Sequence, residues 1–279
     1  MTTRNASLAG WKPSRLMVRI LTAFVMLALV IGLVLVGLWG VYILVLLIGG
    51  LALYEFVGLS DHMGSRAPAW LLYPLGAFFA FSGTILKQVD VTLVLSLVLV
   101  GGLAAFLFLP GRRQGLSRWA MGLAGALYIG MPFNYYLLIY TSKPNGLIWT
   151  LFTIFAVVVS DAAALLVGSR MGRHPFFNSI SPNKTVEGAI AGVIGSIGVM
   201  LIGASMVLGQ SPIHAVVLGF LIGTSAELGD VVESQMKRIA EVKDSSNLIP
   251  GHGGVLDRID SILFPPILVY FYLSMFQLI

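Results

Sequence analysis

The stretch from residue 229 to residue 260 concentrates ionisable side chains of both signs. Only 10% of the 279 residues are charged. This window, together with Glu227 two positions before it, nevertheless carries eleven charged residues: Glu227, Asp230, Glu233, Lys237, Arg238, Glu241, Lys243, Asp244, Asp257, Arg258 and Asp260. In a chain of this composition, such a cluster indicates that a polar group is bound or transformed here.

Helical spacing puts opposite charges of this window on one face. If the first part is a helix, Asp230, Ser234, Lys237 and Glu241 recur at i, i+4, i+7 and i+11. A carboxylate, a hydroxyl, an ammonium and a second carboxylate would then form one stripe. We expect carboxylate and cation to share a face, with Asp244 in a solvated spacer after it.

The Pro-Gly-His-Gly-Gly sequence at 250–254 should reverse the chain. Proline lacks an amide hydrogen and glycines favour turn conformations, so a helix cannot continue through it. A second helix would begin near Val255, with Asp257 and Asp260 in its first turns, where carboxylates suit the positive end of the helix dipole. We therefore expect carboxylates from two helices to meet at one point.

A second candidate site precedes the glycine-rich segment that starts at Gly188. Ser181, Lys184, Thr185 and Glu187 lie in a short polar loop, where hydroxyls, an ammonium and open backbone donors at a helix start suit a phosphate. The alternative is a capping segment with a lysine that extends to the interface. The loop is not a Walker P-loop, because the required Gly-x4-Gly-Lys pattern is missing from the sequence.

Composition indicates an integral membrane protein. The chain is 57% hydrophobic with a mean hydropathy of +0.93, outside the range of soluble globular proteins. Without cysteine there are neither disulfides nor thiolate metal sites. Basic residues are scattered among apolar segments, which argues against nucleic-acid binding. The first apolar run is as long as a full span and lacks a small-residue cleavage site, so we reject a signal peptide.

Apolar runs long enough to cross a bilayer, about 20 residues each, predict an all-α bundle of about nine transmembrane helices. They fall at 20–37, 39–58, 68–86, 91–109, 119–140, 147–168, 188–208, 213–230 and 256–278. With a cytoplasmic N-terminus, every Lys and Arg except Lys87 and Lys143 lies on the inner side, as the positive-inside rule requires. The C-terminus is then outside.

We expect one integral domain with two unlike halves. All acidic residues except Glu55, Asp61 and Asp90 lie between residues 161 and 260, so 1–150 is interpreted as scaffold and 151–279 as the catalytic half. Asp161 lies about 10 Å inside its span at 1.5 Å per residue, where a carboxylate normally faces a polar cavity or a partner. Glu55 is unusual for a scaffold helix and receives no role.

In the charged window and the polar loop before it, the sequence resembles the phosphatidate cytidylyltransferases, also called CDP-diacylglycerol synthases. Their signature is a Ser, two residues, Lys-Arg, four residues, Lys-Asp, a spacer, Pro-Gly-His-Gly-Gly, two residues and Asp-Arg-x-Asp. The chain matches it in order and spacing from Ser234 to Asp260, and the likeness extends upstream through 181–188 to Asp161.

The resemblance implies that CTP and phosphatidate react to give CDP-diacylglycerol and pyrophosphate on the cytoplasmic side of a bacterial inner membrane. Phosphatidate brings its own anionic nucleophile, so catalysis reduces to positioning and charge stabilisation. Mg²⁺ is the implied cofactor, with a second cation left open, and membrane lipids are the surroundings; a homodimer also stays open. The implied metal ligands are Asp230, Asp257 and Asp260. The implied catalytic groups are Lys237, Arg238, Lys243, Arg258 and His252. The implied substrate-binding residues are Asp161, Ser181, Lys184, Thr185, Glu187 and Ser234.

Two other functions are weighed against this one. A CTP-dependent polyprenol or lipid kinase needs the same boundary site, metal and charges. A secondary transporter also uses intramembrane acids and broken helices, but the charges here cluster on one side of the membrane rather than at its midplane.

Overall fold

The computed structural model describes residues 24–25, 28–30, 32–105, 112–177, 179–251 and 253–279, and in this part the chain is helical. The described residues contain no β-strand, and their only β-type pairings are two isolated bridges. The helices in chain order are α2 Leu38–His62, α3 Ala69–Phe81, α4 Val91–Ala105, α5 Arg112–Thr141, α6 Gly146–Met171, α7 Val186–Met200, the π-helix η1 Leu201–Val207, α8 Pro212–Ile239, α9 Leu256–Leu263 and α10 Pro265–Met275.

Five of the described helical segments are long and apolar enough to cross a membrane. They are α2, the part of α5 from Gln114 to Thr141, α6, α7 continued by η1, and α8. Helices α3 and α4 are apolar but shorter. The predicted integral membrane bundle is therefore confirmed in its class. Much of the first expected span, 20–37, lies outside the described residues.

The expected last span is divided in two. Helix α9 ends at Leu263 and α10 begins at Pro265, with Phe264 between them. Proline cannot donate the backbone hydrogen bond that would continue the helix, and its ring clashes with the preceding turn. Pro265-Pro266 therefore interrupts the expected span and leaves α9 as a separate short helix.

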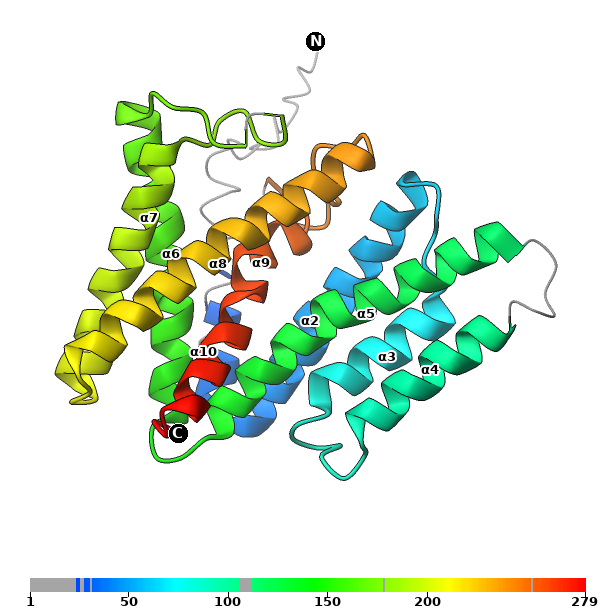
Figure 1. The fold of residues 1–279 in the computed structure, drawn as a ribbon, viewed down its shortest axis with the longest axis horizontal. Helices are drawn as coiled ribbons and strands as arrows, with labels where there is room; N and C mark the ends of the chain where they lie inside the picture. Colours follow the sequence, from blue (N-terminus) through cyan, green and yellow to red (C-terminus); the bar gives the residue numbers. More distant parts are fainter. Residues whose placement is uncertain (1–23, 26–27, 31, 106–111, 178, 252) are drawn as a thin grey trace, which may run out of the picture.

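Two hydrophobic clusters make the core. One joins α2, α3 and α5, and it takes in Leu256, Ile259 and Leu263 of α9. The other joins α6, α7 and α8 with Val269 and Leu273 of α10. In Figure 1, α2, α3, α4 and α5 lie on one side of the molecule, and α6, α7 and α8 lie on the other. The short helix α9 packs on α2, α5, α6 and α8, and so connects the two groups.

Glycines allow α7 to approach α6 closely. A Cβ added at Gly188 would lie 2.8 Å from the Ala164 carbonyl oxygen, and one at Gly192 would lie 2.8 Å from Ser160 Oγ. At Gly195 it would meet Ala163 Cβ at 3.3 Å. Larger side chains would force the helices apart, and this packing fixes where α7 begins.

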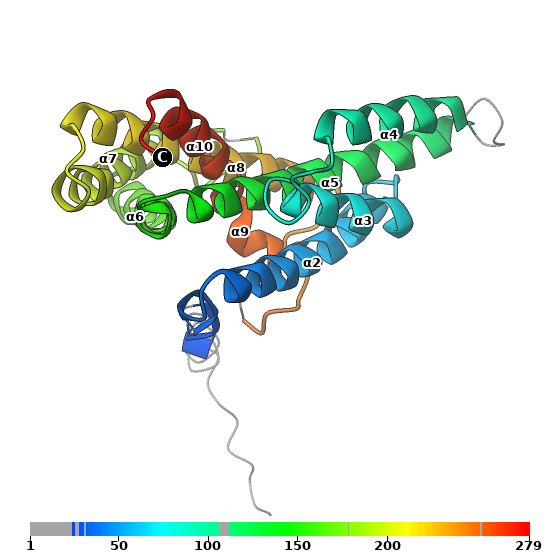
Figure 2. The same cartoon turned by 90° about the horizontal axis from the view of Figure 1, so that it is seen from below.

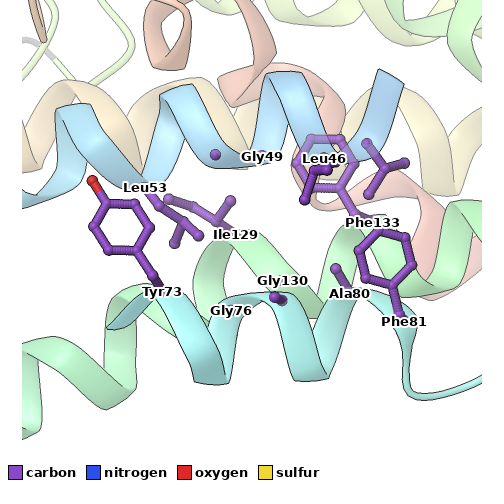
Figure 3. A pocket seen from close by; sticks show the side chains of 13 residues that line it. Leu46, Gly49, Leu53, Tyr73, Gly76, Ala80, Phe81, Ile129, Gly130 and Phe133 are labelled. Atoms are coloured by element: carbon purple, nitrogen blue, oxygen red, sulfur yellow. The ribbon is translucent and has the colours of Figure 1, made fainter. Parts of the chain in front are cut away.

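The connections with polar sequence gather at one end. The α6–α7 and α8–α9 connections lie at the end of the bundle opposite the α5–α6 connection and the C-terminus (Figure 1). Between α2, α3 and α5 lies an apolar pocket of about 520 Å³, lined by residues such as Leu53, Phe81 and Phe133 (Figure 3). No charged side chain lines it. The chemistry must be sought at the polar end.

Candidate active site

One pocket gathers most of the side chains singled out in the sequence. It encloses about 1100 Å³, including its open mouth. The predicted site residues that line it are Asp161, Ser181, Lys184, Thr185, Asp230, Lys237, Asp257, Arg258 and Asp260. Glu227, Asn183, Asp244 and Ser261 also contribute. Residues up to 100 positions apart in the sequence thus meet at the polar ends of α6, α7, α8 and α9.

Lys184 enters the pocket from the α6–α7 connection. Phe176 N donates to the Lys184 carbonyl oxygen at 2.8 Å, and Thr185 caps α7 by accepting from Gly188 N at 3.2 Å. The Lys184 ammonium lies 2.8 Å from both Glu227 Oε2 and Asp230 Oδ2. Burial alone would lower the pKa of Lys184, but the two carboxylates outweigh it and the pKa is raised. The ammonium therefore stays charged at neutral pH.

Lys237 makes the matching contact on the other side. Its ammonium donates to Asp257 Oδ1 at 2.8 Å and pairs with Glu233 one turn earlier on α8. Glu233 is fully buried, so this ion pair is shielded from solvent. Lys237 thereby connects α8 to the first turn of α9.

Asp257 is held by the turn that precedes it. Gly254 N donates to Asp257 Oδ2 at 2.8 Å, and Ser245 N donates to the same oxygen at 3.0 Å. Gly251 and Gly253 have φ of 79° and 82°, a left-handed conformation that glycine adopts at little cost. The predicted reversal is confirmed, and it brings Asp257 of α9 into the lining of the same pocket as Asp230 of α8.

The predicted stripe on α8 is wrong at its last member. Helix α8 ends at Ile239, and Glu241 has a φ of 56° beyond the helix end. Ser234 does lie over Asp230, donating to Asp230 Oδ1 at 3.2 Å. Spacing alone extended the helix too far, because Glu241 and Val242 close the turn by hydrogen bonds back to Arg238 and Lys237 carbonyl oxygens.

Other predicted residues lie around the pocket rather than in its lining. Arg238 Nε donates to the Ile180 carbonyl oxygen at 3.0 Å and so holds the α6–α7 connection. Glu187 accepts from Arg173 N at 3.1 Å and from His174 Nδ1 at 2.6 Å. Lys243 lines a neighbouring pocket of about 780 Å³, which it shares with Arg258 and Asp244. His252 lies outside the described residues.

Neither Asp244 nor Glu55 was assigned a role at the site from the sequence. Asp244 is exposed, as a spacer residue should be, yet it lines both polar pockets. Glu55 lies on α2, is only 2% exposed, and accepts hydrogen bonds from the α8–α9 connection. The one sequence signal for Glu55 was its charge in an apolar helix, since such a residue normally has a partner.

An apolar pocket adjoins the charged one. It encloses about 900 Å³ between α7 and α8, and Phe176, Ile190 and Phe220 line it. Glu227 lines both pockets. A polar head and apolar chains of one molecule can therefore lie on either side of Glu227.

The helix bundle places lysines, an arginine and carboxylates around a pocket beside an apolar groove. This combination is suited to a membrane enzyme that acts on phosphate groups of lipids. The sequence matches the cytidylyltransferase family over residues 17–276. The chain belongs to this family, as the resemblance implied.

Individual relatives agree with the family. A phosphatidate cytidylyltransferase of Bacillus subtilis (strain 168) is 30% identical over 269 residues, which cover 93% of this chain and 98% of that protein. The enzyme of that name from Synechocystis sp. is 46% identical over 132 residues, 46% of this chain and 44% of that protein. One from Mycobacterium bovis is 32% identical over 210 residues, 72% and 66% of the two chains.

Proposed function

We propose that this chain transfers the cytidylyl group of CTP to phosphatidate, giving CDP-diacylglycerol and pyrophosphate, in the pocket lined by Lys184, Lys237, Asp230 and Asp257. The observation that carries the proposal is the arrangement of these two lysines, each paired with a carboxylate, beside an apolar groove. The family supports the reaction. The pocket supports its location.

The chain's own residues position charge rather than form a covalent intermediate. A phosphate oxygen of phosphatidate attacks the α-phosphorus of CTP, one P–O bond forms, and the bond to the bridging oxygen breaks, so that pyrophosphate leaves with the electron pair. Lys184 and Lys237 neutralise charge that moves onto the leaving group. Arg258, which lines both polar pockets, is suited to bidentate phosphate contact.

Mg²⁺ is the cofactor that the donor set suits. Among the described residues, no three His, Cys, Asp or Glu side chains form a ready-made metal cage. Mg²⁺ is commonly bound through one or two carboxylates plus substrate phosphates and water. Asp230 and Asp257 would hold it, with Asp260 beside them, and it would supply positive charge at the reacting phosphates.

For the membrane arrangement, we propose about nine spans with a cytoplasmic N-terminus and a cytoplasmic pocket, in a bacterial inner membrane. The Lys and Arg distribution supports this orientation. A water-soluble nucleotide and a bilayer-bound lipid can meet only at such a boundary. The homodimer remains an expectation that sedimentation of the solubilised protein would decide.

Pyrophosphate release by the purified protein tests this function. Release should require CTP, phosphatidate and Mg²⁺ together. Release that persists without phosphatidate would show simple nucleotide hydrolysis. Consumption of CTP that yields CDP instead of pyrophosphate would favour the lipid kinase, and no consumption would favour the transporter.

A further inference from the structure

Glu55 is a buried carboxylate whose partners all come from a distant part of the chain. It lies on α2, and its side chain accepts four hydrogen bonds from residues about 190 to 200 positions later. Oε1 accepts from Ser246 Oγ at 2.6 Å and Val255 N at 2.8 Å. Oε2 accepts from Leu256 N at 2.6 Å and Ser245 Oγ at 3.1 Å. Three of the donors belong to the connection between α8 and α9, which runs beside α2 in Figure 2, and the fourth, Leu256 N, begins α9.

These bonds lead directly to Asp257. Ser245 Oγ lies 3.0 Å from Asp257 Oδ2 as well as 3.1 Å from Glu55 Oε2, so the two carboxylates share one hydroxyl proton. Ser245 N also donates to Asp257. Val255 N and Leu256 N belong to the start of α9, where backbone donors have no partner inside the helix. Glu55 therefore fixes both the start of α9 and the serine that orients Asp257.

The packing leaves room for this contact only because residue 254 is glycine. A Cβ at Gly254 would lie 2.8 Å from both carboxylate oxygens of Glu55 and would collide with Ser245 Oγ. An acidic side chain buried in an apolar helix is costly unless it is well hydrogen-bonded. The number of donors that converge on Glu55 shows that α2 and the connection are built around this contact.

We propose that Glu55 is a positioning residue for the transfer reaction: from α2 it holds the α8–α9 connection so that Asp257 faces the pocket. The inference rests on the proposed function for its effect on turnover. It also makes α2 part of the catalytic apparatus. Without Glu55, the connection would sample other conformations and Asp257 would lose its orientation.

The test combines turnover with a direct measure of loop mobility. The chain has no cysteine, so Leu248→Cys, at an exposed position of the connection, accepts a single spin label. Glu55→Gln keeps the size but turns one oxygen into a donor that faces backbone N–H groups. We expect kcat with CTP and phosphatidate to fall about tenfold or more, and label mobility to rise, in protein that remains folded.

Asp61→Asn is the matched control. Asp61 lies on the same helix, is exposed and pairs only loosely with Arg66 at 3.6 Å, so kcat and mobility should not change. The inference is overturned if Glu55→Gln keeps wild-type kcat, or if kcat falls while the label stays as immobile as before. If the wild-type chain transfers no cytidylyl group, the proposed function fails, and label mobility alone still decides the role of Glu55.

A second variant covers failure of Glu55→Gln to fold. Ser246→Ala removes one of the four hydrogen bonds to Glu55 from the loop side. Ser246 Oγ also accepts from Leu248 N at 3.1 Å, beside the label, so turnover is the measurement for this variant. In this variant kcat should fall about threefold, because Glu55 keeps three of its four donors. Wild-type turnover in folded Ser246→Ala protein would overturn the inference.

Discussion

At the scale of single residues, the ammonium group of each pocket lysine lies between two carboxylates. Lys184 lies between Glu227 and Asp230, and Lys237 lies between Glu233 and Asp257. An ammonium with such partners keeps its charge. It is also preorganised to meet a phosphate group without reorienting. In the proposed reaction, the lysines would thus serve both the folded state and catalysis.

Replacing Lys184 by Ala should lower turnover at least tenfold, which corresponds to about 1.4 kcal/mol of transition-state stabilisation. The variant removes one cation and leaves Glu227 and Asp230 facing the substrate phosphates. Steady-state kinetics on purified protein measures the loss, and size exclusion shows whether the fold is kept. Lys87→Ala, in an exposed loop at the predicted outer side, is the control. Unchanged kinetics in Lys184→Ala would make the loop a simple helix cap.

Residue spacing was sufficient to predict one part of this site and not the other. Asp230, Lys237 and Asp257 lie in one window whose helix and turn signals are local. The pairing of Lys184 with Asp230 was not readable, since it depends on how α7 packs against α8. The role of Glu55 could not be predicted for the same reason. Its hydrogen-bond partners are about 190 to 200 residues away, and no local pattern specifies them.

At the scale of elements, α8 and α9 act as one unit. Asp230 belongs to α8 and Asp257 to α9, and Lys237 joins the two helices. The helix and turn signals predicted that these two carboxylates come together, and both line the same pocket. The charge spacing extended α8 as far as Glu241, but the helix ends at Ile239. Hydrogen bonds from Glu241 N and Val242 N close the turn there.

If Asp230 and Asp257 hold one Mg²⁺, Asp230→Asn and Asp257→Asn should each abolish nearly all turnover. An amide keeps the size of the side chain but loses the charge that Mg²⁺ requires. The double variant should be little worse than either single one, because groups that act together are strongly non-additive. Activity losses that multiply as independent effects, measured at saturating Mg²⁺, would contradict a shared ion.

The close contact at Gly254 gives another prediction. Gly254→Ala would push Ser245 and Glu55 away from the turn, so turnover should fall about tenfold or more while most of the bundle stays folded. Gly198→Ala is the control, because a Cβ added there meets nothing within 4 Å. Assays of both variants in the same detergent distinguish a local effect from general destabilisation. Equal activity in the two would show that the turn tolerates displacement.

At the scale of the whole molecule, the two groups of helices meet at α9. Its apolar side chains pack with α2, α3 and α5, while its carboxylates face a pocket shared with α6, α7 and α8. The sequence predicted the membrane class from hydropathy alone. It did not predict which helices pack together, because lipid-facing and protein-facing apolar residues look alike. The division into scaffold and catalytic half stays a prediction.

The orientation of the bundle can be tested with single cysteines at the two ends of α6. A membrane-impermeant thiol reagent added to intact cells should label Lys143→Cys and should label Met171→Cys only after the membrane is opened. The prediction follows from the cytoplasmic excess of Lys and Arg. Labelling of Met171→Cys in intact cells, with Lys143→Cys protected, would place the pocket on the outer side.

The fate of labelled CTP tests the central claim most directly. With purified protein, phosphatidate and Mg²⁺, label on the α-phosphate should enter the lipid fraction, and label on the γ-phosphate should leave as pyrophosphate. This pattern follows from attack on the α-phosphorus. Label from the γ-phosphate in the lipid would contradict cytidylyl transfer and assign the protein to the lipid kinases.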